Sequence, residues 1–402
     1  MSSLIEEISI LADIDLSKSI AMKFVIMMGI VSLFADMTYE GARSITGPYL
    51  GTLGASAAMV GLIAGFGEFL GYGFRLISGY FSDTTQRYWL IAIIGYIVNL
   101  AAVPLLALTG HWWTAGLLII AERAGKGIRV TPRDAMLSHA AHRVGMGLGF
   151  GLHEAMDQAG AMAGPLLVSL VLYTQGQYTY CFAILFFPAL VSISMLFISK
   201  AAYPDPGQLE EQSKLLKLTN LKTNKAYWIY LFGASLVAMG YADFALIAYH
   251  LAKIQLLTPV FIPMLYAAAL GSNIVMSPLL GYFYDKKGFI ILIAITFLTS
   301  FFTPLVFWGD ASLALLGSIL WGIGLGAQGS LMRAIVAHMV HKEKRGSAYG
   351  IFNFVFGLFW FIGSALMGVL YDISITSLIM FSLLCQWLAV PVLWAAKRKL
   401  LL

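Results

Sequence analysis

Long apolar stretches alternate with short polar turns along almost the whole chain. Each stretch is about twenty residues long, which is the length that a helix needs to cross roughly 30 Å of hydrocarbon. The pattern therefore predicts an all-α membrane protein with twelve transmembrane helices. Their approximate limits are 22–48, 57–81, 89–109, 113–131, 145–173, 179–199, 226–251, 258–282, 289–309, 312–337, 346–371 and 376–396.

One long polar connection separates the sixth stretch from the seventh. It covers residues 200–225 and contains two prolines, two glutamates and several lysines. We therefore expect two pseudo-symmetric six-helix bundles, formed by residues 22–199 and 226–396, with residues 200–225 as a linker. Residues 1–21 and 397–402 are expected to be tails.

The composition supports a membrane protein and excludes several other classes. The 402 residues are 59% hydrophobic and 11% charged, with a mean hydropathy of +0.83, which is too apolar for a soluble surface. The alternating ten-residue segments of a transmembrane barrel are absent. Cys181 and Cys385 both lie inside apolar stretches, so they suggest no disulfide framework, zinc site or redox motif. We expect no metal, no cofactor and no enzymatic activity.

Lysine and arginine fall mainly on one side of the predicted helices. That side includes both tails and the linker, whereas the connections on the other side hold little beyond Lys253. Positively charged loops stay in the cytoplasm, so both termini are predicted to be cytoplasmic and the protein to lie in the inner (plasma) membrane. The net charge of +5 then reflects orientation, and no nucleic-acid partner is expected.

The fourth stretch departs from the apolar pattern, because residues 121–134 hold six formal charges. On a helix, Glu122, Lys126 and Arg129 share one face, and Arg123 lies about a hundred degrees away. An unpaired charge at the centre of a bilayer costs roughly 2.5–3.5 kcal/mol on insertion scales. These side chains therefore need partners or a water-filled cavity.

Other predicted helices of the first half carry acidic side chains that could serve as partners. Asp36, Glu40 and Arg43 form a stripe on the first helix at i, i+4 and i+7. Whether a buried carboxylate holds a proton depends on the balance between desolvation and a neighbouring cation, so this region could couple transport to protons. A fully paired network that never titrates is the alternative. Counting the helical rise per residue from the predicted end of each span places four side chains at a similar depth in the membrane, namely Asp36, Glu68, Arg123 and Asp157.

The two halves repeat one short motif but differ in charge. GYFSD at 79–83 returns as GYFYD at 281–285, about half the chain length later. Both copies follow the second helix of their half, and a repeat at this period indicates a duplicated transporter bundle. The helices of the second half carry fewer charged side chains, chiefly Asp243, His250 and Arg333, so the polar centre is asymmetric.

These motifs resemble those of the major facilitator superfamily, and the resemblance covers nearly the whole chain. GYFSD resembles the loop signature G-x-L-x-D-R-x-G-R-R, although only one arginine of its basic continuation remains; the second copy fits better. In that family the loop locks the inward-closed arrangement of the two halves. A simple turn-capping role for the first aspartate is the alternative. The resemblance implies gating roles for Arg75, Gly79, Asp83, Arg87, Gly281, Asp285 and Lys286.

Two further stretches resemble signatures of the same family. Arg123-Ala-Gly-Lys-Gly127 resembles R-x-x-Q-G, with Lys126 in place of the usual glutamine, and this arginine is associated in the family with proton coupling. Gly160, Gly164 and Pro165 resemble G-x-x-x-G-P, which the family uses chiefly in exporters and antiporters. Generic helix packing is the alternative for the second motif.

We therefore expect a secondary active transporter that exports a small organic solute in exchange for protons by alternating access. The solute could be a drug-like compound, a metabolite or a siderophore, and the chain is expected to act as a monomer in the lipid bilayer. An uptake symporter of the same fold is one alternative, and a passive channel or membrane scaffold is another. The expected coupling and cavity residues are Asp36, Glu40, Arg43, Glu68, Arg123, Lys126 and Asp157.

Overall fold

The computed structural model describes residues 2–204, 225–340 and 345–400, and all regular structure in those ranges is helical. A helix satisfies its own backbone hydrogen bonds, as a chain in hydrocarbon requires. The first half forms α1 (Ser2–Thr52), α2 (Ala57–Thr85), α3 (Tyr88–Leu105), η1 (Leu106–Leu108), α4 (Trp112–Val144), α5 (Met146–Gln175), α6 (Tyr178–Ile184) and α7 (Phe186–Ala202). The second half forms α8 (Lys225–Met239), α9 (Phe244–Lys253), α10 (Phe261–Lys287), α11 (Ile290–Ser300), α12 (Phe302–Phe307), α13 (Ala311–Met339), α14 (Arg345–Ile373) and α15 (Ile375–Leu400).

Eleven helical segments in the described ranges are long and apolar enough to cross a membrane. The prediction of an all-helical membrane protein is therefore confirmed, but the count of twelve spans is not. The predicted span that is missing from these eleven is α4. This helix has 33 residues and continues through Pro132, but it carries too many charged side chains to be identified as a membrane span from its composition. The helix α1 already begins at Ser2, while its membrane-length segment is Lys18–Thr52, against a predicted span of 22–48. The predicted linker at 200–225 lies mostly outside the described residues.

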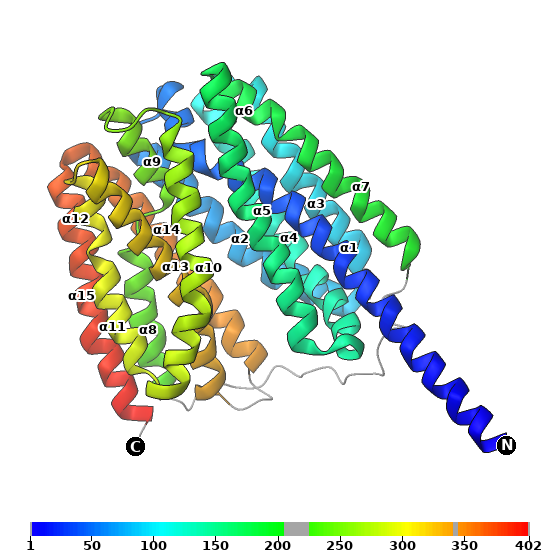
Figure 1. Ribbon diagram of the computed structural model, residues 1–402. Coiled ribbons are helices and arrows are strands. Elements are labelled where there is room, and N and C mark those ends of the chain that lie inside the picture. Colours follow the sequence, from blue (N-terminus) through cyan, green and yellow to red (C-terminus); the bar gives the residue numbers. More distant parts are fainter. Residues whose placement is uncertain (1, 205–224, 341–344, 401–402) are drawn as a thin grey trace.

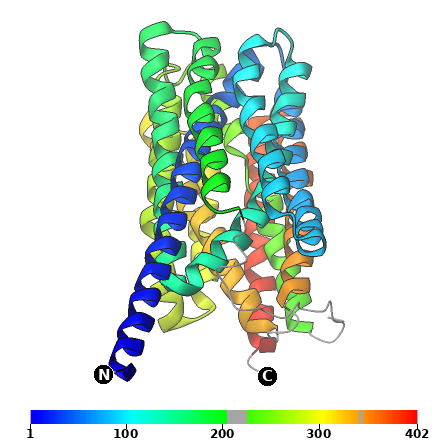
Figure 2. The ribbon, with the colours of Figure 1, turned by 90° about the vertical axis from the view of Figure 1, so that its right-hand side faces the viewer.

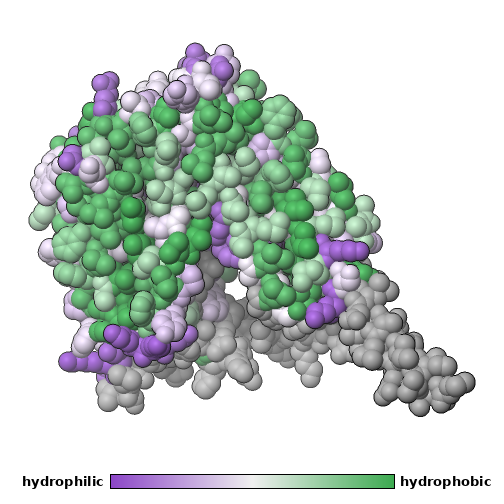
Figure 3. All heavy atoms as spheres, in the orientation of Figure 1, coloured by the Kyte–Doolittle hydropathy of each residue, from purple (hydrophilic) through white to green (hydrophobic). Residues whose placement is uncertain are grey.

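The two halves of the chain lie beside each other. In Figure 1, α1–α7 lie mainly on the right and α8–α15 on the left. Both chain ends lie at the same end of the molecule in the two ribbon views (Figure 1, Figure 2). We call this end the terminal end and the opposite one the distal end. On the face drawn in Figure 3, an apolar belt separates hydrophilic residues at these two ends.

The most extensive contacts between the halves are those of α2 with α14, α1 with α9, and α5 with α10; α2 also contacts α9, and α1 also contacts α10. At the distal end these contacts include hydrogen bonds. The Asp372 carboxylate of α14 accepts from the N–H groups of Ala57 and Ala58, the first residues of α2, at 3.2 and 2.9 Å. The Tyr249 hydroxyl of α9 donates to the Ala55 carbonyl at 3.3 Å. Polar contacts therefore hold the two halves together at the distal end.

The terminal end has a different shape on the face drawn in Figure 3. A notch opens there between the two halves, with hydrophilic side chains at its inner edge. The molecule is thus joined at the distal end and hollowed at the terminal end. The helices α1, α2, α4 and α5, which carry most of the predicted site residues, lie in the half on the right of Figure 1.

Candidate functional site

The charged stripe on α1 is buried. Asp36 and Glu40 are only 3% and 7% exposed, although both carry carboxyl groups, and Arg43 follows within one turn. The spacing i, i+4, i+7 places all three on one side of the helix. So much buried charge is tolerated only when each group has a partner.

Partners for the acids of α1 come from α4. Arg129 Nη2 lies 3.1 Å from Asp36 Oδ1, and the Tyr39 hydroxyl donates to the other Asp36 oxygen at 3.1 Å. Lys126 donates to the Tyr39 hydroxyl, and its Nζ lies 3.8 Å from Glu40 Oε1. The predicted charged face of α4 is therefore packed against the stripe on α1.

Glu68 of α2 connects two arginines. Its Oε1 lies 3.1 Å from Arg43 Nη2 and 3.4 Å from Arg123 Nη1. Arg123 Nε also lies 3.4 Å from Glu122 Oε2, and the other oxygen of that carboxylate accepts from Asn99 Nδ2 at 2.9 Å. Glu68 and Arg123, which were predicted to share a depth, are thus in direct contact.

Two contacts link these charges to the second half. Arg43 Nη2 lies 3.1 Å from Asp243 Oδ2, and the Tyr266 hydroxyl of α10 donates to Glu40 Oε2. Both partners are buried. Two neighbouring residues of the α1 stripe therefore each bind across the junction between the halves.

Asp243 lies in a break within the membrane-length segment Lys225–Lys253, between α8 and α9. Its Oδ1 accepts from the Ala245 N–H at 3.0 Å and so caps α9, while its other oxygen faces Arg43. Broken helices at membrane depth occur where the chain is buried or lines a cavity, and they often form ion and substrate sites.

A second cluster lies farther toward the terminal end of the first half. Arg133 Nη1 lies 3.6 Å from Asp157 Oδ1 and donates to Ser32 Oγ at 3.1 Å. Ser32 Oγ is also 2.9 Å from His153 Nε2, and Arg133 Nη2 lies 2.8 Å from the half-exposed Asp134 carboxylate. We call the ion-paired groups of α1, α2, α4, α5 and the α9 cap the central network; they are Asp36, Glu40, Arg43, Glu68, Glu122, Arg123, Lys126, Arg129, Arg133, Asp157 and Asp243.

Gly160 and Gly164 of α5 lie directly against the backbone of α1. A Cβ atom on Gly160 would lie 2.0 Å from the Leu33 carbonyl oxygen, and one on Gly164 would lie 2.2 Å from that of Met37. Neither position has room for a side chain. Pro165 follows inside α5, which continues to Gln175. The exporter-like motif therefore forms the close contact between α1 and α5.

In the first copy of the repeated motif, the residues predicted to form a gate do not contact one another. The Arg75 guanidinium lies 5.2 Å from the centre of the Tyr72 ring instead of pairing with Asp83, and Asp83 and Arg87 are exposed. Gly79 packs closely on α4, because a Cβ atom there would lie 3.0 Å from a threonine side chain of that helix.

The charged side chains of the second copy of the motif are also exposed. Lys286 Nζ lies 4.3 Å from the centre of the Tyr282 ring, and Asp285 is exposed. A Cβ atom on Gly281 would meet nothing within 4 Å, so packing does not explain this glycine. Gating by either copy stays a prediction.

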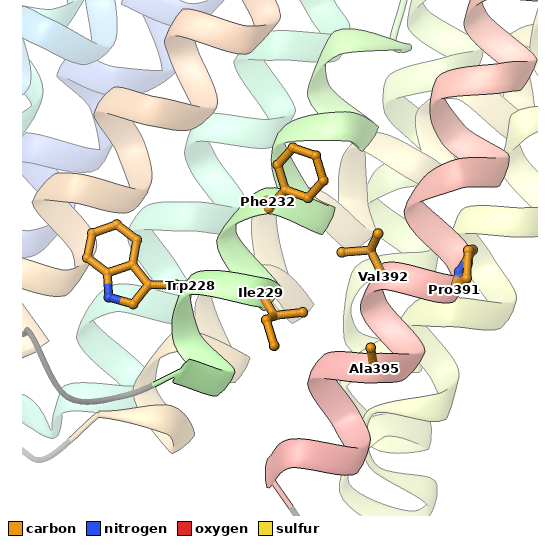
Figure 4. Close-up of a pocket in the computed structure, with 6 residues that line it drawn as sticks. All are labelled: Trp228, Ile229, Phe232, Pro391, Val392 and Ala395. Atoms are coloured by element: carbon orange, nitrogen blue, oxygen red, sulfur yellow. The ribbon is translucent and has the colours of Figure 1, made fainter.

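An apolar groove of about 520 Å³ lies on the second half. Figure 4 shows Val392 extending from α15 toward α8 and Trp228 pointing away from α15. None of the lining residues belongs to the central network, so this groove is not the charged site. The lining residues are Trp228, Ile229, Phe232, Pro391, Val392 and Ala395.

The described residues offer little to a metal ion. Within the ranges that the structure describes, no three or more His, Cys, Asp or Glu side chains are grouped to hold one. Cys181 and Cys385 are buried and unpaired. The candidate site is thus a set of ion pairs, hydroxyl groups and carboxyl groups.

Sequence reasoning did not select Tyr39, Arg129, Arg133, Asp243 or Tyr266 as site residues. Two of these residues could have been recognised from the sequence as site residues: Arg129 lies on the charged face of α4, and Asp243 is an acidic residue inside an apolar stretch. Tyr266 gave no signal, because a tyrosine in an apolar helix usually packs against its neighbours. Only contact between helices distant in sequence reveals its role.

Sequence comparisons point to a single family. The family model described as Major Facilitator Superfamily matches residues 26–364. An uncharacterized protein of Mycobacterium tuberculosis is 35% identical over 382 residues, covering 94% of this chain and 93% of the relative. An uncharacterized MFS-type transporter of Methanocaldococcus jannaschii is 28% identical over 371 residues, covering 88% and 89%.

Solved structures share the fold at much lower sequence identity. A variant of the nucleoside transporter NupG superposes with a TM-score of 0.76 at 14% identity, covering 94% of this chain and 99% of its own. A bacterial homolog of the human lysosomal transporter Spinster, inward-facing and unoccupied, gives 0.73 at 12%, covering 95% and 98%. A variant of the peptide transporter POT gives 0.73 at 13%, covering 94% and 95%.

Proposed function

Since the chain belongs to the major facilitator superfamily of membrane transporters, we propose that it is a secondary active transporter that exports a small organic solute in exchange for protons. The family resemblance seen in its motifs is confirmed by the match along residues 26–364 and by the fold shared with solved transporters. Alternating access would open the solute site first to one face of the membrane and then to the other.

The observation that carries this proposal is that buried charges of the first half bind the second half directly. Arg43 contacts Asp243, and Glu40 accepts a hydrogen bond from Tyr266. Movement of one half against the other must break these contacts, and a buried charge left without a partner is costly. Protonation of a carboxylate, or arrival of a solute, would lower that cost and so permit the movement.

The conformation supports the same mechanism once an orientation is assigned. We place the terminal end in the cytoplasm, following the positive-inside rule. Residues 22–199 and 226–396 then form the two moving bundles, with α4 as the twelfth span. In this orientation the joined distal end faces outward and the notch in Figure 3 faces the cytoplasm. The separation of Arg75 from Asp83 fits an open cytoplasmic gate.

The proposed direction is export because Gly160, Gly164 and Pro165 match the exporter-like motif, and its two glycines lie in the contact between α1 and α5. Proteins of similar fold carry nucleosides and peptides according to their names, so the fold accommodates organic solutes of that size. Drug-like compounds, metabolites and siderophores are the classes to screen. We propose that one chain in the inner membrane is the working unit.

The test is a solute screen with purified protein in proteoliposomes that carry an imposed pH gradient. Export by antiport predicts saturable solute movement opposite to the proton movement. Solute movement in the same direction as protons would replace export with uptake by symport. Movement that does not saturate, or none for any solute, would favour a channel or a scaffold. Liposomes without protein provide the background rate.

A further inference from the structure

The apolar groove on the second half lies between α8 and α15, at the surface of the molecule. Its volume of about 520 Å³ falls in the range of roughly 300–1,000 Å³ that holds small organic ligands. Inside the groove the two helices touch, because a Cβ atom on the buried Gly233 would lie 2.9 Å from a methyl carbon of Leu393. Four of the residues that line the groove are exposed, namely Trp228, Phe232, Pro391 and Ala395.

The two helices run in opposite directions, so the start of α8 and the end of α15 lie at the same end of the groove (Figure 4). Measured from the contact of Gly233 with Leu393, Lys225 lies about 12 Å along α8 and Lys399 about 9 Å along α15, at 1.5 Å per residue. The membrane-length segment of α8 begins at Lys225, and that of α15 ends at Lys399. This end of the groove therefore lies near a membrane surface.

Three basic side chains at that end lie on the helix faces that line the groove. Residues three or four apart share one face of a helix. Lys225 precedes the lining residue Ile229 by four positions on α8. On α15, Arg398 and Lys399 follow the lining residue Ala395 by three and four positions. We call Lys225, Arg398 and Lys399 the groove cations.

No acidic side chain of the two helices balances the groove cations. Neither α8 nor α15 contains an aspartate or a glutamate. All three groove cations are exposed, and within the ranges that the structure describes none of them forms an ion pair. Three positive charges at one end of the groove are therefore available to an anion.

A tryptophan on each helix marks the level of the membrane surface. Trp228 and Trp394 are 44% and 40% exposed, and tryptophan is enriched where a membrane meets water. Trp228 lies about one turn inside Lys225, and Trp394 about one turn before Arg398. The groove thus runs from the interface into the hydrocarbon, and the groove cations lie at the level of the lipid headgroups.

The lining of the groove and the charge at its end fit one kind of occupant. A free phosphate ion would bind the groove cations but leave the apolar groove empty. An uncharged lipid would fill the groove but leave the cations without a partner. A phospholipid with a net negative charge satisfies both, because its acyl chain is apolar and its headgroup is anionic. Basic pockets between transmembrane helices bind such headgroups in other membrane proteins.

We propose that the groove between α8 and α15 is a binding site for an anionic phospholipid, whose acyl chain lies in the groove and whose headgroup is held by the groove cations. The positive-inside rule explains why basic residues gather at this end, but it does not require them to lie on the groove face. Lys397 shows the contrast, because its Nζ lies 4.8 Å from the centre of the Trp394 ring and its position is outside that face. The site does not depend on the direction or the coupling of transport, so it would stand if the proposed antiport failed.

The experiment is fluorescence quenching of the purified protein in phosphatidylcholine vesicles, with brominated phosphatidylglycerol added in increasing amounts. Bromine on the acyl chains quenches tryptophan on contact, and the emission that Trp228→Phe removes is the signal of the groove. This signal should saturate at a low share of brominated phosphatidylglycerol, whereas brominated phosphatidylcholine should quench it only in proportion to its share. The control is Trp308, the 58% exposed residue that follows α12, whose emission should respond equally to both lipids.

Charge variants test the headgroup contact. Each lysine or arginine near an anionic headgroup is worth about fivefold in affinity, so replacing all three groove cations by glutamine should lower the preference for phosphatidylglycerol on the order of 100-fold. Lys397→Gln removes the same charge from the same end of α15 and should keep the wild-type preference. An unchanged preference in the triple variant, or an equal loss in Lys397→Gln, would reduce these residues to an orientation signal and overturn the site.

A groove variant tests the acyl-chain contact. Ala395→Phe places a ring in the groove and should weaken quenching by both lipids, whereas Leu117→Phe, at a 61% exposed position of α4, should not. Quenching that is unaffected by Ala395→Phe would show that no acyl chain occupies the groove. Inorganic phosphate should displace no more lipid than chloride of equal ionic strength does, and greater displacement would replace the lipid with a free phosphate ion as the occupant.

Discussion

The two halves of the molecule have buried centres of opposite character. In the first half, ionisable side chains of α1, α2, α4 and α5 lie together in the central network. In the second half, aromatic rings occupy the buried centre. The ring centres of Phe244 and Tyr266 are 4.3 Å apart, and Tyr241 lies 5.9 Å from Trp321 and 5.5 Å from Trp360.

This difference assigns the halves different tasks. A carboxyl group can gain or lose a proton and so change its charge, whereas the aromatic rings remain uncharged at neutral pH. Under the proposed function, we therefore expect protons to act chiefly in the first half. The second half, with its aromatic centre, meets those charges through Asp243 and Tyr266.

The largest effect is expected at Arg43, the cation shared by Glu68 and Asp243. Arg43→Gln leaves the buried Asp243 carboxylate without a cation and takes one of two arginines from Glu68, which should destabilise the protein by about 3–5 kcal/mol and abolish solute flux. Thermal unfolding in lipid nanodiscs and flux in proteoliposomes measure the two effects. Arg87→Gln, at an exposed arginine, is the control and should behave like the wild type. Normal stability and flux in Arg43→Gln would show that charge does not join the halves.

Tyr266→Phe should have the next largest effect, since it removes a hydrogen bond to a charged group while preserving the ring. We expect a loss of about 1.5–3 kcal/mol and a weaker dependence of flux on the pH gradient. The control is Tyr230→Phe, whose hydroxyl donates to the Met332 carbonyl at 2.8 Å inside the second half. This variant should lose about 0.5–1.5 kcal/mol and keep its coupling. Equal loss of coupling in both would contradict a special role for Tyr266.

Gly160→Ala tests the contact between α1 and α5. The new Cβ atom would lie 2.0 Å from the Leu33 carbonyl oxygen, so the helices must separate, at a cost of about 1–3 kcal/mol. Gly151→Ala on the same helix is the control, because nothing lies within 4 Å of its Cβ position. Unfolding of the two variants side by side measures the difference. Similar stabilities would mean that close approach at Gly160 is dispensable.

The smallest effect is expected at the distal end, where Asp372 binds the first N–H groups of α2. Asp372→Asn removes the charge beside the helix end, which is worth about 0.3–1 kcal/mol, and should shift the population toward an open distal end. Distances between spin labels at Leu53 and Ile373 would report the shift. Asp310→Asn, at a cap inside the second half, should leave those distances unchanged. An unchanged distance distribution in Asp372→Asn as well would remove the proposed closing role.

Much of the fold could be predicted from the sequence, because apolar length and helical period are local properties. The stripe on α1 and the charged face of α4 were visible for the same reason. The pairing of Asp36 with Arg129, and the reach of Tyr266 to Glu40, were not. They depend on how helices far apart in sequence pack, and a single sequence does not determine which buried charges meet. The break at Asp243 was hidden because its neighbours are as apolar as a continuous helix.

The most direct test of the account is proton flux and solute flux measured together in proteoliposomes. Asp36→Asn and Asp157→Asn should lose gradient-driven transport while still exchanging solute across the membrane. Glu68→Gln should transport more slowly at the wild-type proton-to-solute ratio, and the control Glu154→Gln should match the wild type. If both aspartate variants keep the wild-type ratio, the central network is structural and coupling through the first half is wrong.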